Sequence, residues 1–265
     1  MKIPAGFKPS PGLAYMCVTG TAFLFATSTV VSRGVHELIP PVGGTFWRWF
    51  LASMIMLAFV WRDLLPRLKD YTGSLGLVVI PAVALTLAVS FIRHATNGVE
   101  QSFFIVYLRE IGFAGTLIGV LFSMAEVMNG IGSLAAGRLA KSMPIPWAMV
   151  GFTAIGIALI TITPFLGKVF ALLALAHALR RLTEGLVQPL MFSIQARAVP
   201  PDLQGSVVGL RVTNNRLASI VTPFLMGFLV QYFGFEYGFV AMGCLLLLIC
   251  AALAVAIAVI PALRK

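Results

Sequence analysis

The chain has 265 residues, of which 59% are hydrophobic and 11% are charged, and its formal net charge is +10. A water-soluble core cannot accommodate so large an apolar fraction, so the composition argues against a soluble enzyme and predicts an all-α, polytopic membrane protein in the lipid bilayer. Most basic residues flank apolar runs, where they indicate the orientation of the helices in the membrane. We therefore expect no nucleic-acid partner.

Apolar runs long enough to cross a bilayer recur along the whole chain. We expect eight transmembrane helices, over residues 13–31, 43–61, 75–108, 113–136, 147–164, 169–194, 206–232 and 238–260. The first run follows Lys2 and Lys8, as a signal peptide would, but it is longer than the usual apolar core of a signal peptide and no small-residue cleavage pattern follows it. It is therefore expected to remain as a span.

Residues 75–108 could form one long helix or two short spans, and the loop charges distinguish the two. With one span, ten Lys and Arg fall on one side of the membrane and three on the other, whereas with two spans the sides carry seven each. Positive residues gather on the cytoplasmic side. We therefore expect one span, both termini in the cytoplasm, and residence in the cell (inner) membrane.

The stretch 172–194 is apolar but carries Arg180, Arg181 and Glu184 near its middle. Such charges are costly in lipid, so they are expected to face a protein interior or a water-filled cavity. Four polar residues of this segment are spaced by four, three and four positions, which places them on one face of a helix. This stripe consists of His177, Arg181, Glu184 and Gln188.

Arg180 and Arg181 are both within helical reach of Glu184. Since one carboxylate cannot neutralise two guanidinium groups, we expect a surplus of one positive charge here. Glu100 or Glu126 from another helix, or an anionic substrate, could balance it. Glu126 lies on the polar face of its helix, where we expect an isolated buried carboxylate that could carry a proton. Arg93 and Glu100 share a face and could neutralise each other or their neighbours.

These polar groups predict a path for a solute or ion, against the alternative that they only pair structurally. The candidate pathway residues are Arg93, Asn97, Glu100, Glu126, His177, Arg181, Glu184, Gln188, Asn215 and Arg216. Arg216 is expected to face the bundle, and Arg211 to lie near a cytoplasmic loop.

The sequence Val31-Ser-Arg-Gly-Val-His-Glu-Leu-Ile-Pro-Pro41, followed by Phe46-Trp-Arg-Trp49, resembles the first two helices of EamA-type drug/metabolite transporters. The resemblance covers about residues 10–70. It implies a metabolite or drug exporter, but the further helices of that family do not follow.

From about residue 75 the chain resembles the six-helix C-terminal half of a major facilitator superfamily transporter. Gly137, Arg138, Leu139 and Lys141 belong to a segment similar to the G-x-L-A-D-[RK] loop motif of that family, with Lys141 where Asp is usual. Arg181-Leu-Thr-Glu-Gly185 is similar to its Arg-x-x-x-Gly pattern. Residues 204–223 resemble its fifth helix, and 233–239 the start of its sixth.

We therefore expect two segments, residues 1–74 and 75–265, and a secondary transporter of a small solute with proton coupling as one alternative. The other hypotheses are an EamA-type exporter and a fused or truncated half without transport of its own, in which case a homodimer could replace a missing half. No Walker loop, catalytic motif or paired-cysteine metal signature is present, so no enzyme activity, cofactor or metal is expected.

Overall fold

The computed structural model describes residues 80–201 and 203–263, together with the isolated positions 12, 16, 19, 20, 54 and 76. The chain divides into two compact units, Met1–Leu68 and Lys69–Lys265. The second unit contains nearly all of the described residues, and these are helical or in short connections, with no strand among them. The two expected spans before residue 75 and the EamA-like segment lie outside the described residues.

The run that could have been two spans is one uninterrupted helical rod. Helix α3 (Pro81–Val99) continues through the π-helical segment η2 (Glu100–Phe104) into α4 (Ile105–Glu110). Pro81 suits the first position of a helix, where no hydrogen-bonded N–H is needed. The rod ends in a tight turn at Gly112, whose positive φ of 98° favours glycine.

Three of the expected spans correspond to single helices with shifted ends. The region 113–136 corresponds to α5 (Gly115–Ser142), and 147–164 corresponds to α6 (Ile145–Thr161) followed by the 3-10 turn η3 (Thr163–Leu166). The region 169–194 corresponds to α7 (Phe170–Ala198).

Helix α8 (Gln204–Val259) contains the last two expected spans, and η4 (Pro261–Leu263) follows it. The two parts of α8 join at Gly234, where φ is 78° and ψ is 173°. Glycine adopts these angles without strain, whereas other residues do not, so the helix changes direction at this one glycine. The expected break between residues 232 and 238 is therefore a kink without a loop.

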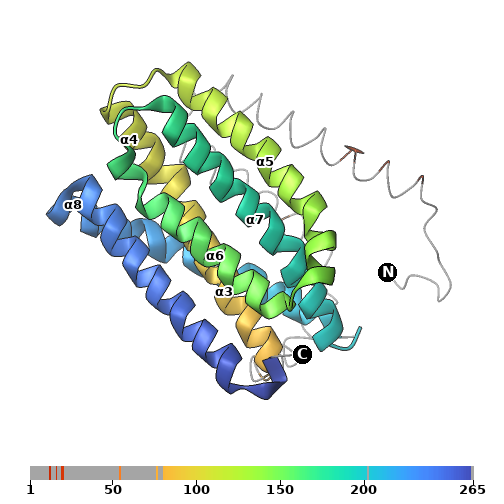
Figure 1. Ribbon diagram of the computed structural model, residues 1–265. Coiled ribbons are helices and arrows are strands. Elements are labelled where there is room, and N and C mark those ends of the chain that lie inside the picture. Colours follow the sequence, from red (N-terminus) through yellow and green to blue (C-terminus); the bar gives the residue numbers. More distant parts are fainter. Residues whose placement is uncertain are drawn as a thin grey trace. The chain divides into compact units, whose positions relative to one another are not determined.

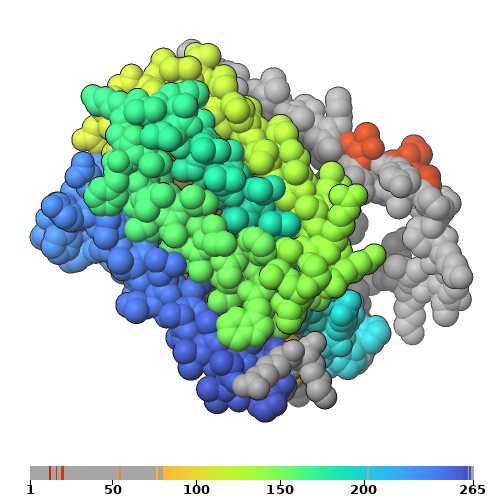
Figure 2. All heavy atoms as spheres, in the orientation of Figure 1, coloured from red at the N-terminus to blue at the C-terminus, as the bar shows by residue number. Residues whose placement is uncertain are grey.

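The helices of this unit form two layers. Helix α5 packs along α7, α7 contacts α3, and α3 packs along the first part of α8, so α5 and α8 form the two edges of one layer. Helix α6 and the second part of α8 lie over this layer (Figure 1) and make the face nearest the viewer in Figure 2. The main apolar core, which includes Ile92, Met149, Val187 and Phe239, fills the space between them.

Close helix contacts depend on small residues. A Cβ added to Gly185 on α7 would overlap the backbone of Asn129 on α5, and one added to Gly132 would overlap the backbone of α7 at Leu182. Gly243, on the second part of α8, lies equally close to Thr161 on α6. Such approaches are typical of helices packed within membranes, where backbone contact replaces the hydrophobic effect.

Among the described helices, α5 and α8 are long and apolar enough to cross a membrane, and α6 is apolar but shorter. Helix α7 and the α3–η2–α4 rod are not among the described helices of this kind. The number eight for the whole chain stays a prediction.

Reporter fusions test the expected topology. Fusions after Pro66, Met143 and Lys265 should all report the cytoplasm, because the loop charges place these three positions on the positive side. Paired alkaline phosphatase and green fluorescent protein fusions at each position provide the measurement. A periplasmic signal at the last two positions alone would show that residues 75–108 cross the membrane twice.

Candidate functional site

Three arginines and three glutamates from α3, η2, α5 and α7 meet inside the bundle. They are Arg93, Arg180, Arg181, Glu100, Glu126 and Glu184. All except Glu126 have side chains that are at most 10% exposed. Since unpaired charges in such surroundings would cost several kcal/mol each, the pairing within this cluster decides whether the fold can contain it.

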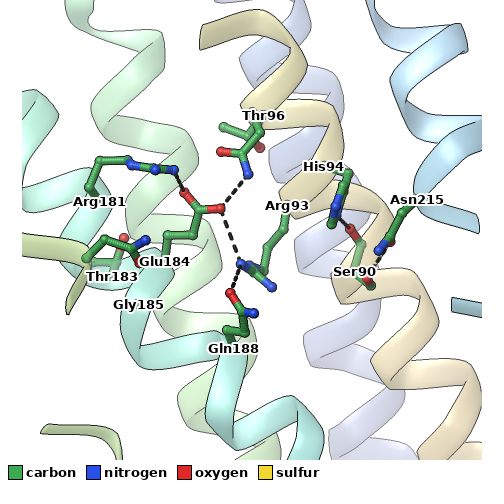
Figure 3. Close-up of polar contacts among 12 residues, drawn as sticks. Ser90, Arg93, His94, Thr96, Arg181, Thr183, Glu184, Gly185, Gln188 and Asn215 are labelled. Carbon is green, nitrogen blue, oxygen red and sulfur yellow. Dashed lines mark hydrogen bonds and ion pairs between the residues drawn. The ribbon is translucent and has the colours of Figure 1, made fainter. Parts of the chain in front are cut away.

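Glu184 is the hub of one half of the cluster, between α7 and α3 (Figure 3). Its Oε1 accepts hydrogen bonds from Arg93 Nη2 at 3.2 Å and from Asn97 Nδ2 at 2.5 Å, and its Oε2 accepts one from Arg181 Nη1 at 2.6 Å. Arg93 Nη2 also donates to Gln188 Oε1 at 3.3 Å. Arg181 of the predicted α7 stripe and Arg93 and Asn97 of the α3 face therefore meet at one carboxylate.

Glu100 is the hub of the other half. Its Oε2 accepts a hydrogen bond from Arg180 Nη1, and its Oε1 lies 3.1 Å from His177 Nε2, which is outside hydrogen-bond geometry. Arg180 Nη2 donates to Asn97 Oδ1 at 3.0 Å, so Asn97 joins the two halves. Glu100 is the first residue of the π-helical segment, a type of irregularity that often occurs at functional sites.

His177, the histidine of the predicted stripe, lies on the apolar side of Glu100. The rings of Phe104 and Phe122 lie 5.2 and 4.8 Å from the His177 ring, measured between centroids. The side chain of His177 is 3% exposed. His177 therefore borders the cluster and does not open toward solvent.

Glu126 is not the isolated buried carboxylate that was expected. Its side chain is 58% exposed and accepts a hydrogen bond from Arg181 Nη2. Asn129, one turn further along α5, donates to the other carboxylate oxygen at 3.3 Å. The polar face of α5 points away from the core, which leaves Glu126 at the open edge of the cluster.

The predicted pairing of both α7 arginines with Glu184 is half correct. Arg181 reaches Glu184, but Arg180 turns toward α3 and pairs with Glu100, because successive helical positions point about 100° apart. Arg93 and Glu100 do not pair with each other. Three carboxylates balance three guanidinium groups, so the predicted positive surplus is neutralised by Glu100 and Glu126 without an anionic substrate.

A polar link extends the cluster to α8. Ser90 Oγ donates to Asn215 Oδ1 at 2.6 Å, and Asn214 Nδ2 donates to the Leu87 carbonyl at 2.8 Å. Arg216, expected to face the bundle, is instead exposed, because Ala218 and Thr222 occupy the side of α8 that packs on α3.

A second contact lies nearer the start of α8. Arg211 Nη1 donates to Gln195 Oε1 at 3.1 Å, and its guanidinium lies 4.1 Å from the centroid of the Phe192 ring. Gln195 Nε2 in turn donates to Thr86 Oγ1 at 3.1 Å. Arg211 therefore ties α8 to α7 and α3 at a distance from the charged cluster.

The expected loop motif is helical. Gly137, Arg138, Leu139 and Lys141 belong to the last turns of α5, which ends at Ser142. Arg, Leu, Ala and Lys favour helix, and Pro144 disfavours helix at the residue before it, so the connection shrinks to the short segment before α6. Arg138 and Lys141 are exposed there.

Sequence reasoning left two polar residues of this site, Arg180 of the cluster and Ser90 of the link to α8, out of the candidate pathway. Arg180 is a mid-span charge that the sequence does not assign to the pathway, although Glu100, its partner in η2, is one of the two carboxylates expected to balance the surplus. Ser90 gave less signal, since it is one of many small polar residues in an apolar run, although it lies one turn before Arg93 and His94.

The fold is a helical bundle whose interior contains a paired network of charges. Residues 86–265 match the Major Facilitator Superfamily. The chain belongs to this family, as the resemblance of the C-terminal segment predicted, and is therefore of the major facilitator transporter type. No curated protein and no solved structure matches the chain. The EamA-like resemblance over residues 10–70 lies outside the matched range and receives no support from the comparisons.

Proposed function

We propose that this chain is a secondary transporter of a small polar solute and that the solute passes along the open face of the α5–α7–α3–α8 layer. The observation that carries the proposal is the continuous line of polar contacts across this layer, from Glu126 through Arg181, Glu184 and Arg93 to Gln188. Its buried part holds the charges in place, and its open end at Glu126 offers a contact to a solute.

The charge balance refines the proposed solute. An anion is not needed to neutralise the six-residue cluster, so the proposal is a small polar solute of either charge. Coupling to protons is part of the proposal because Glu126 is an exposed carboxylate bonded to a buried arginine. Protonation of Glu126 would weaken its bond to Arg181, and a solute could then compete for that guanidinium.

The substitution Arg181→Gln tests the role of the cluster in transport. It removes the contacts to Glu126, Glu184 and Glu100. Glu184 keeps Arg93 and Asn97, Glu100 keeps Arg180, and Glu126 is open to water. Uptake by proteoliposomes should therefore fall at least about tenfold, a loss of about 1.4 kcal/mol or more of transition-state stabilisation, with little change in melting temperature. The matched control is Arg197→Gln, which removes an exposed arginine near the end of α7.

The assay uses a panel of labelled carboxylates, sugars, amino acids and amines, with pyranine inside the vesicles to report proton movement. Uptake without any change in internal pH would reject only the proton coupling and leave the proposed pathway standing. Normal uptake by the Arg181→Gln protein would reject the pathway. No uptake of any solute by the unaltered protein would favour a transporter half without activity of its own, and outward pumping of drugs alone would favour the EamA-type alternative.

A further inference from the structure

A cavity separate from the charged cluster lies where the end of α4 meets the kink of α8 at Gly234 (Figure 1). Its volume is about 380 Å³, which is within the range of small-ligand sites. Its wall consists mainly of aromatic and acidic residues, and none of them belongs to the charged cluster. These residues are Tyr107, Glu110, Phe233, Phe235, Glu236 and Tyr237.

Aromatic rings form much of this wall. The centroid of the Tyr107 ring lies 6.2 Å from that of the Phe235 ring, and the two planes are inclined by 45°. Tyr107 is buried, whereas Phe233 is 58% exposed and Tyr237 is 69% exposed. Exposed aromatic side chains near the end of a span often anchor a helix among lipid headgroups. The aromatic wall alone therefore does not define a binding site.

Two carboxylates give this cavity a negative charge. Glu110 and Glu236 line it and are exposed, and its lining contains no Lys or Arg. In the helices that the structure describes, every carboxylate of the charged cluster contacts an arginine, whereas the side chains of Glu110 and Glu236 make no ion pair or hydrogen bond. These two charges are therefore open to a cationic ligand.

The hydroxyl group of Tyr107 lies near both carboxylates and interacts electrostatically with each of them. This hydroxyl donates its only hydrogen to the Pro164 carbonyl at 3.2 Å, so toward a ligand its oxygen can only accept a hydrogen bond. Ionised carboxylates are acceptors as well. These three polar groups of the wall therefore favour a ligand that carries a positive charge.

A metal ion suits this wall poorly. Calcium and magnesium ions take six or more oxygen ligands, whereas the wall offers two carboxylates and a phenolic oxygen. No three His, Cys, Asp or Glu side chains gather into a metal site among the described residues. An organic ammonium ion requires fewer oxygen atoms, because the faces of aromatic rings attract it as well.

We propose that this cavity, the α4–α8 pocket, binds an organic ammonium ion. Glu110 and Glu236 balance its charge, and the exposed rings of Phe233 and Tyr237 contact its alkyl groups. The pocket is independent of the proposed transport path, because it shares no residue with the charged cluster. A free amine and the ammonium headgroup of a lipid share this chemistry, and the experiment distinguishes the two sources.

Titration calorimetry of the full-length protein with choline tests the pocket. The protein is held in nanodiscs of phosphatidylglycerol, a lipid without an ammonium group. Choline should bind once per chain. Its uncharged carbon isostere, neohexanol, should bind at least about tenfold more weakly, because it keeps the shape of choline but loses the charge that carboxylates and aromatic rings attract.

Substitutions in the wall test the assigned roles. The double variant Glu110→Gln/Glu236→Gln should bind choline about tenfold more weakly, as expected for the loss of two partly exposed charge pairs. Tyr237→Leu should weaken binding about twofold to fivefold through the loss of one ring face. The matched control is Arg109→Gln, which removes an exposed charge beside Glu110 that is not part of the lining and should not weaken binding.

No binding of choline, equal binding of choline and neohexanol, or an unchanged affinity in the double variant would overturn the pocket. The comparison of choline with neohexanol uses the unaltered protein, so it does not depend on how well the variants fold. Choline binding by a protein that takes up no solute of the panel would leave the pocket standing and reject only the transporter role.

Nanodiscs of phosphatidylcholine identify the source of the ammonium group. If the occupant is a lipid headgroup, this lipid competes with choline, and the apparent affinity for choline should fall at least about fivefold relative to phosphatidylglycerol. An equal affinity in the two lipids assigns the pocket to a free amine.

Discussion

Replacing Glu100 by leucine should destabilise the protein by about 3–5 kcal/mol, the usual cost of removing one partner of a buried ion pair. Glu100 is 2% exposed and holds Arg180, which is 4% exposed. Without the carboxylate, the guanidinium keeps only its bond to Asn97 Oδ1, and its charge remains in an apolar interior. The measurement is the free energy of unfolding in mixed micelles titrated with a denaturing detergent.

The double variant Glu100→Leu/Arg180→Met provides the control. Buried ion pairs replaced by apolar residues of similar volume are often as stable as the original, so the double variant should recover most of the loss caused by Glu100→Leu. An additive effect of the two substitutions would show that the residues act independently, contrary to the contact between them. Uptake should stay low in the double variant, because Asn97 loses its bond to Arg180 there and the two halves of the cluster separate.

The helical segments and the polar character of the site could be predicted from sequence because both depend on local patterns. Apolar runs of bilayer length mark the helices, and the mid-run charges of α7 are buried, as the cost of placing them in lipid predicts. The single rod of α3, η2 and α4 followed from the loop charges. The break in α8 at Gly234 followed from the resemblance to the family's fifth and sixth helices.

The partners of the charges could not be predicted because they depend on how each helix is rotated about its axis. Arg180 and Arg181 are neighbours in sequence but point toward different helices, and only the packing of α7 between α3 and α5 shows which carboxylate each one reaches. The exposure of Glu126 likewise follows from the rotation of α5. That rotation is fixed by the contact of Gly132 and Gly185 with the opposing backbone.

The same contact makes Gly185→Ala the most damaging of the small substitutions. The added Cβ would overlap the carbonyl oxygen of Asn129, which belongs to a helical backbone and cannot turn aside. Helices α5 and α7 must then move apart, and the hydrogen bond from Ser133 Oγ to the Gly185 carbonyl, at 3.3 Å, is lost with their packing. Overpacking of this kind costs typically about 1–3 kcal/mol, and the absence of a flexible neighbour places this position at the upper end.

The effect should reach the site because the bond between Arg181 and Glu126 spans the same pair of helices. Uptake by the Gly185→Ala protein should therefore fall together with its stability. Gly130→Ala is the matched control, since an added Cβ there meets nothing within 4 Å and alanine favours helix by about 0.5–1 kcal/mol over glycine. Thermal unfolding should thus shift in opposite directions for the two variants, and a shift of the same sign and size in both would refute the close contact of α5 with α7 as the feature that holds the cluster together.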